Sequence, residues 1–271
     1  MSRAHQQHQI DANTWTYTGL VIATFVFGLM LDRFGGIAGQ LAVSVWAWGL
    51  MFALIAASRS QWRLPFYACL VWATAGEMFL SLVWGLYTYR LENVPFFVPP
   101  GHVMLFWIGL MFALRIPQWF VHLVPAVAIA YAGYAFYSGV DTISIMLAGL
   151  FILCWLQPEG RRLYSLMLVI ALLAELYGTW LGNWTWHRDV PYLGLSSNNP
   201  PLAAGGFYCV LDVLVVFTAW SLRPRGAGEA GRTLATPAIM PVTSKRDLNS
   251  QRNLTAQLEI TAKENLIAQE D

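Results

Sequence analysis

Residues 77–102, EMFLSLVWGLYTYRLENVPFFVPPGH, place an acidic side chain inside an apolar segment and end in a cluster of aromatic residues, prolines and a histidine. An ionisable side chain inside a membrane helix is costly to bury and usually has a function. A related stretch follows at residues 175–201, ELYGTWLGNWTWHRDVPYLGLSSNNPP. Both keep the order Glu, Gly, aromatic, Thr, aromatic, basic, Pro, Pro-Pro, which indicates an internal repeat.

The repeat aligns residues 85–90, GLYTYR, with residues 182–187, GNWTWH, and the prolines that follow also align. An alternative is that two helix ends resemble each other only because Trp and Tyr gather at membrane interfaces. We favour the duplication.

The composition is that of a membrane protein. The chain is 57% hydrophobic, 11% charged and contains 13 Trp, whereas about a quarter of the residues of soluble domains are charged. A net charge of +1 gives no basis for nucleic-acid binding. Cys69, Cys154 and Cys209 stand alone in apolar runs, without the spacing of a zinc or redox motif. The lipid bilayer is therefore the expected partner.

Apolar runs of about 20 residues, long enough to cross a bilayer, predict an all-α polytopic membrane bundle of eight transmembrane helices. The runs are residues 15–32, 37–58, 64–88, 100–116, 118–138, 142–157, 162–182 and 201–222. Seven helices are the alternative, because the fourth and sixth runs are short. The repeat offset of four helices makes the halves, about 15–116 and 118–222, two parallel four-helix repeats.

Arginines in the short loops predict the orientation, because they favour the cytoplasmic side. With alternating helices, one side holds Arg3, Arg59, Arg63, Arg115, Arg161, Arg162, Arg223 and Arg225. Both termini are therefore expected in the cytoplasm, with the loop at 183–200 outside a bacterial inner membrane. Residues 1–14 form an N-terminal cytoplasmic segment without signal-peptide features. The polar residues 223–271 predict a disordered cytoplasmic tail.

Three acidic residues are the candidate catalytic groups: Glu77, Glu175 and Asp212. An isolated ionised carboxylate in hydrocarbon is too costly to persist, so each must be neutral or paired. A neutral carboxyl group in an apolar cavity can act as a general acid. The structural alternative is that these groups only form hydrogen bonds between helices. No Lys lies in any predicted span, which excludes a retinal Schiff base.

Aromatic and polar residues near these acids are the candidate substrate-binding groups. Aromatic ring faces stabilise a positive charge, although an interfacial aromatic belt is the alternative. His102 is a candidate proton shuttle or a structural residue at a helix start, and the amide of Asn199 is a candidate ligand or a turn residue. The full set is Trp84, Tyr87, Tyr89, His102, Trp180, Trp184, Trp186 and Asn199. No spacing typical of a haem or metal site is present, so no cofactor and no metal are expected.

The G-x-Y-x-Y motif at Gly85, Tyr87 and Tyr89, with an upstream Glu77 and downstream V-P and P residues, resembles the membrane carotenoid-biosynthesis proteins, namely the carotenoid hydratases and the integral-membrane lycopene cyclases. The resemblance implies a lipophilic isoprenoid substrate, protonation of a double bond by a carboxylic acid, and hydration or cyclisation without a cofactor. A proton-coupled small-molecule transporter and a non-catalytic membrane assembly factor are the alternatives.

Overall fold

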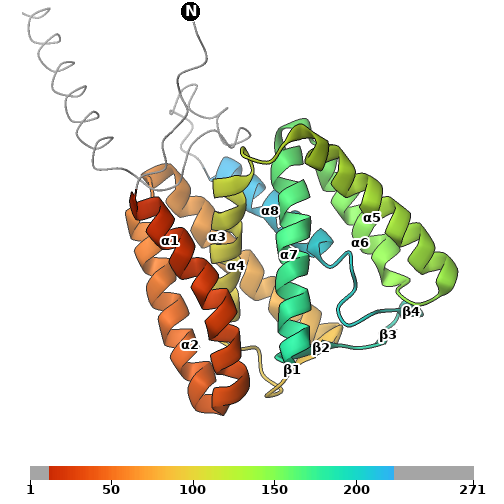
Figure 1. The fold of residues 1–271 in the computed structure, drawn as a ribbon, viewed down its shortest axis with the longest axis horizontal. Helices are drawn as coiled ribbons and strands as arrows, with labels where there is room; N and C mark the ends of the chain where they lie inside the picture. Colours follow the sequence, from red (N-terminus) through yellow and green to blue (C-terminus); the bar gives the residue numbers. More distant parts are fainter. Residues whose placement is uncertain (1–11, 223–271) are drawn as a thin grey trace, which may run out of the picture.

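Long apolar segments that end at Gly, Pro or Arg form the helices of the computed structural model, which describes residues 12–222 (Figure 1). The predicted helical bundle is confirmed. Four helical segments are long and apolar enough to cross a membrane: Thr14–Ala57, Ser60–Val83, Gln118–Ser138 and Pro158–Leu181. These segments indicate that the chain associates with a membrane. Most of the predicted N-terminal segment and all of the predicted tail lie outside the described residues.

The chain begins with a helical hairpin. It consists of α1 (Ala12–Ala23), the π-helix η1 (Thr24–Gly28) and α2 (Leu29–Ala57). The backbone of Gly36 is not helical (φ 59°, ψ −145°), and the chain reverses direction there (Figure 1). A positive φ is readily adopted by Gly, which has no Cβ. The gap between the first two predicted helices is therefore a sharp reversal inside α2.

The next segment comprises α3 (Ser60–Glu77), the π-helix η2 (Met78–Val83), the strand β1 (Tyr87–Tyr89) and α4 (Val98–Phe112). The prediction that the third helix extends to residue 88 is wrong. The helix ends at Val83 because Gly85 takes a φ of 74°, after which the two tyrosines lie in an extended strand. The expectation of purely α-helical structure missed this strand.

The second part of the chain contains the remaining elements. They are α5 (Gln118–Ser138), α6 (Ile143–Trp155), the 3-10 helix η3 (Pro158–Gly160), α7 (Arg161–Leu181), β2 (Trp184–Trp186), β3 (Asp189–Val190), β4 (Leu195–Ser196) and α8 (Gly205–Ser221). The bounds of α5 agree with the predicted run. As predicted, α4 and α6 are short.

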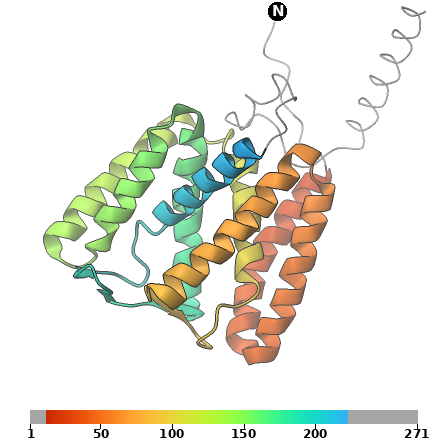
Figure 2. The ribbon, with the colours of Figure 1, turned by 180° about the vertical axis from the view of Figure 1, so that it is seen from behind.

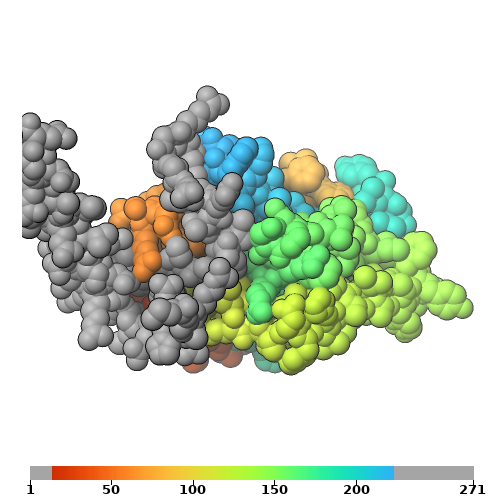
Figure 3. Space-filling model, turned by 90° about the horizontal axis from the view of Figure 1, so that it is seen from above, coloured from red at the N-terminus to blue at the C-terminus, as the bar shows by residue number. Residues whose placement is uncertain are grey.

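Helices α3, α4, α7 and α8 pack together, with the α1–α2 hairpin on one side of them and α5–α6 on the other (Figures 1 and 2). Seen from the end away from the strands, α8 lies between the orange α2–α3 part and the green part of the chain (Figure 3). Small residues allow this close packing. A Cβ on Gly205 would lie 2.6 Å from the backbone of Leu168, and one on Gly206 would lie 2.3 Å from the carbonyl oxygen of Leu147.

The two stretches that the sequence aligned meet at one end of the bundle, where β1 and β2 pair antiparallel. Thr88 lies opposite Thr185, with Tyr87 opposite Trp186 and Tyr89 opposite Trp184. The backbone N–H groups of Arg90 and His187 continue the ladder by donating to Asn183 and Leu86, each at 2.9 Å. The strands therefore bring the ends of α3 and α7 together.

Candidate acid–base and binding site

Glu77 is the last residue of α3 and accepts hydrogen bonds from the strand that follows it. The hydroxyl groups of Tyr87 and Tyr89 donate to its Oε2 atom at 2.7 Å and 2.6 Å. Alternate residues of a strand point to the same side, so the two tyrosines reach one carboxylate oxygen together. Only 7% of the Glu77 surface is exposed, and these donors compensate for its burial.

Glu175, on α7, accepts a matching pair of hydrogen bonds. The indole N–H groups of Trp184 and Trp186 donate to its Oε2 atom at 2.8 Å and 3.0 Å. The hydroxyl group of Tyr208, on α8, donates to Oε1 at 3.1 Å. A Trp side chain can only donate, so a proton on a neutral Glu175 has to lie on Oε1, which faces Tyr208.

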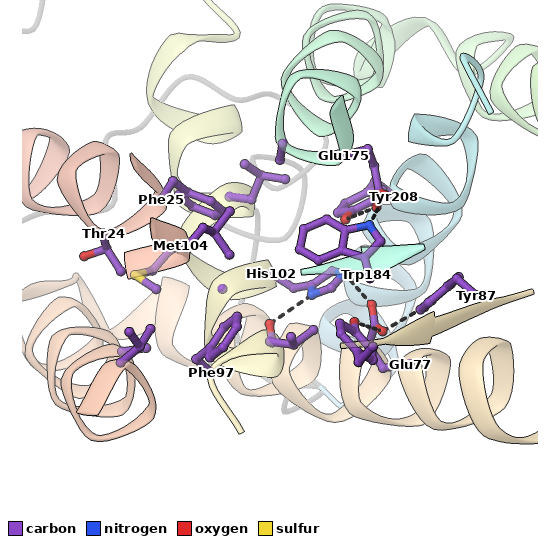
Figure 4. Close-up of a pocket in the computed structure, with 18 residues that line it drawn as sticks. Thr24, Phe25, Glu77, Tyr87, Phe97, His102, Met104, Glu175, Trp184 and Tyr208 are labelled. Carbon is purple, nitrogen blue, oxygen red and sulfur yellow. Dashed lines mark hydrogen bonds and ion pairs between the residues drawn. The ribbon is translucent and has the colours of Figure 1, made fainter. Parts of the chain in front are cut away.

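His102, on α4, forms a pair with Glu77 in which both ring nitrogens are engaged (Figure 4). Its Nδ1 atom lies 3.1 Å from the carbonyl oxygen of Val98, and Nε2 lies 3.3 Å from Oε1 of Glu77. A carbonyl oxygen can only accept, so Nδ1 carries a proton. Nε2 and Oε1 therefore form an ion pair whenever the imidazole is protonated and Glu77 is ionised.

Tyr208 is a site residue that the sequence reasoning missed. Its ring stacks on that of His102, with centroids 4.9 Å apart and an interplanar angle of 10°. The signal in the sequence was its position one helical turn before Asp212, a spacing that places the two residues near each other on α8.

These groups border a mostly apolar hollow between the α1–α2 hairpin, α4 and α7, which we call the larger hollow. Counted together with the open space at its mouth, it measures about 710 Å³. Glu77, His102, Glu175 and Tyr208 lie at one end of it, and Phe25 and Met104 lie farther away (Figure 4). Its other apolar lining includes Leu29, Val43, Ala47, Phe97, Val98 and Leu105. The π-helix η1 contributes to the lining, as such helices often do at functional sites.

A second hollow, the smaller hollow, lies between α3 and α8 and measures about 440 Å³ together with the open space at its mouth. Its apolar lining includes Trp72, Ala73, Leu80, Ala204, Phe207 and Leu211. Five residues line both hollows, namely Glu77, Tyr87, His102, Glu175 and Tyr208. The acid–base residues therefore form a common border between two apolar spaces.

Asp212 lies apart from the two glutamates. It is fully buried on α8 and lines neither hollow. Neither of its carboxylate oxygens has a hydrogen-bond partner among residues 12–222. The predicted grouping of three acids thus reduces to the two glutamates, because Tyr208 reaches the common border and Asp212 lies one helical turn farther along α8.

The other predicted binding residues have different positions. Trp184 lines the larger hollow and Trp186 the smaller one, whereas Tyr89 lines only the larger. The indole N–H of Trp84 donates to the carbonyl oxygen of Pro191 at 3.1 Å. Trp180 is 75% exposed, and Asn199 accepts a hydrogen bond from the backbone of Trp186 at 2.9 Å. Trp84, Trp180 and Asn199 line neither hollow.

The two strand tyrosines remain protonated at ordinary pH. Burial raises the pKa of Tyr87 and of Tyr89 well above the usual value, and the nearby Glu77 raises both further. Both phenols therefore stay protonated and can donate hydrogen bonds to the carboxyl group of Glu77.

Within residues 12–222, no group of three or more His, Cys, Asp or Glu side chains is arranged to hold a metal ion. Comparison with models of protein families, with curated proteins and with solved structures finds no match to this chain.

Proposed function

We propose that this chain is an integral-membrane enzyme that binds a lipophilic, isoprenoid-type molecule and protonates one of its double bonds. The observation that carries the proposal is the pair formed by Glu77 and His102, whose Oε1 and Nε2 atoms lie 3.3 Å apart at the border of an apolar hollow. A polar pair inside apolar surroundings is the arrangement expected of a general acid that acts on a hydrocarbon.

The reaction would begin when the proton of the pair moves to one carbon of a double bond. The π electrons form the new C–H bond, and the neighbouring carbon becomes a carbocation. A water molecule attacks this carbon and loses a proton to a carboxylate, which gives hydration. In cyclisation, a neighbouring double bond attacks instead and a C–H proton is lost. Both outcomes return a proton to the protein and need no oxidant or reductant.

Glu175 and the surrounding rings would stabilise the positive charge. Oriented polar groups in a site that excludes water stabilise a developing charge effectively, and aromatic ring faces attract cations. Trp184, Tyr87 and Tyr208 supply such faces around the two carboxyl groups. Among residues 12–222, the lining of both hollows includes neither Lys nor Arg, so no fixed cation competes with the intermediate.

We also propose that the chain consists of two parallel four-helix repeats with eight spans. The strand register supports this, because the aligned residues Thr88 and Thr185 lie opposite each other. The aligned glycines Gly85 and Gly182 have nearly equal positive φ angles of 74° and 76°. A two-fold axis through the threonine pair would exchange the halves, and each half supplies one glutamate with two aromatic donors from its own strand.

The test is Glu77→Gln, which keeps the shape of the side chain but has no proton to deliver. Purified wild type and variant are incubated with linear isoprenoids in liposomes, and products are measured at equal protein levels. We expect product formation to fall about 100-fold or more, the contribution typical of general acid catalysis. Glu159→Gln, an exposed glutamate in η3, is the matched control and should retain activity. Absence of any product from the wild type would contradict the enzyme proposal and favour transport or assembly.

A further inference from the structure

We propose that the larger and smaller hollows together bind one elongated lipophilic molecule, with an apolar arm in each hollow and the reacting group at the common border. This inference rests on the proposed function for the position of the reacting bond. It goes beyond that function by assigning the smaller hollow as a second binding subsite and by requiring an internal, rather than terminal, reacting group.

The first support is the set of residues that the two hollows share. Glu77, His102, Glu175 and Tyr208 belong to the lining of both hollows. A ligand in either hollow therefore reaches the same side chains. An occupant confined to one hollow would leave the other apolar space unfilled beside the reacting group.

The second support is the order of polarity. Beyond the shared residues, the larger hollow is lined by groups such as Phe25, Val43 and Leu105. The smaller hollow is lined by groups such as Leu80 and Leu211. The sequence of surfaces is thus apolar, polar, apolar. A molecule with a polar or reactive centre and two apolar arms matches this order, because each arm is then removed from water or headgroups.

Two glycines offer matched probes of this arrangement. Gly101 lines the larger hollow and Gly76 lines the smaller one. At both positions an added Cβ meets no atom within 4 Å. The Cβ of a leucine at either position therefore meets no neighbouring atom, and Leu is a better helix former than Gly. Gly133, on α5, has equally open surroundings and lines neither hollow.

The experiment measures equilibrium binding of squalene, a linear isoprenoid with two apolar arms, and of farnesene, a half-length chain. The full-length protein in lipid nanodiscs carries Gly76→Leu, Gly101→Leu or the control Gly133→Leu, each also combined with Glu77→Gln to prevent chemistry. We expect Gly76→Leu and Gly101→Leu each to weaken squalene binding about tenfold, the effect of excluding about two methylene groups. Binding of farnesene should be weakened by only one of these two substitutions. Gly133→Leu should not change the binding of either ligand.

The possible results separate the two proposals. If only one of the two glycine variants weakens squalene binding, or if the wild type does not bind squalene, the two-hollow inference is overturned. Binding that depends on both glycines, without conversion of any isoprenoid, supports the inference and contradicts the enzyme proposal. Conversion of a short isoprenoid that depends on Gly101 alone supports the enzyme and overturns the inference.

Discussion

The imidazole of His102 stacks on the phenol ring of Tyr208, with centroids 4.9 Å apart and planes 10° from parallel. Each ring also contacts a different carboxyl group. His102 lies 3.3 Å from Glu77, and Tyr208 donates to Glu175 at 3.1 Å. The stack therefore connects the two acids.

The protonation of His102 can be observed directly. Because Nδ1 faces the carbonyl oxygen of Val98, we expect Nδ1 to carry a proton at every pH at which the protein is folded. Nitrogen-15 NMR of histidine-labelled protein should show either this neutral tautomer or the imidazolium in the wild type. A neutral His102 protonated only on Nε2 would contradict this assignment.

The hydroxyl group of Tyr89 is expected to contribute to stability through Glu77. Tyr89→Phe removes only the hydroxyl that donates to Oε2 at 2.6 Å. We expect the free energy of unfolding to fall by about 1 to 3 kcal/mol, the cost of removing a hydrogen bond to a buried carboxyl group. Tyr137, which is 92% exposed, provides the control. Tyr137→Phe should change stability by less than about 0.5 kcal/mol, and equal effects of the two variants would argue against a buried network.

Gly178 gives Trp184 the space to reach Glu175. A Cβ on Gly178 would lie only 1.9 Å from the Trp184 ring, so Gly178→Ala must displace the indole and lengthen its 2.8 Å hydrogen bond. Overpacking of this kind typically costs about 1 to 3 kcal/mol. Detergent-induced unfolding and tryptophan fluorescence would both report the change. Gly133→Ala, with open surroundings, should be neutral or slightly stabilising, and a neutral Gly178→Ala would show that the ring can move freely.

The helices and the positions of both glutamates could be predicted from the sequence. Runs of apolar residues determine where helices form, and the repeated motif placed Glu77 and Glu175 in equivalent positions. The strands could not be predicted. The third helix ends at Val83, just before Gly85 takes a positive φ, although the apolar run continues beyond this point. The resulting three-residue strand gains its hydrogen bonds from a partner about a hundred residues away in the chain. Local pattern carries no information about such pairing.

The grouping of acids was harder to predict than their burial. Asp212 and Glu175 both lie in apolar runs, and hydropathy does not distinguish them. Their roles differ because Glu175 faces Trp184 and Tyr208, whereas Asp212 faces a region without a hydrogen-bond partner among the described residues. Which side of a helix meets which neighbour depends on packing across the whole bundle.

Asp212 is therefore expected to be dispensable for the reaction. Asp212→Asn should retain wild-type product formation, because the residue lines neither hollow. Stability should stay about unchanged, since the amide of Asn is as unpartnered at this buried position as the carboxyl group that it replaces. Product assays and unfolding measurements on the same preparation would test both expectations. A loss of product as large as that expected for Glu77→Gln would return Asp212 to the catalytic group.

The proposed orientation predicts which loops are accessible from outside the cell. All four strands lie at one end of the bundle, and the described chain begins at the other (Figure 1). Tyr192, in the loop between β3 and β4, is 90% exposed, and Glu159 is exposed in η3 beside the basic Arg161 and Arg162.

The native cysteines are all buried, so they contribute little background to a labelling experiment. A membrane-impermeant maleimide applied to intact cells should label Tyr192→Cys, whereas Glu159→Cys should react only after permeabilisation, because positively charged loops remain in the cytoplasm. The reverse pattern would place the strands and the carboxyl groups nearest to them on the cytoplasmic side.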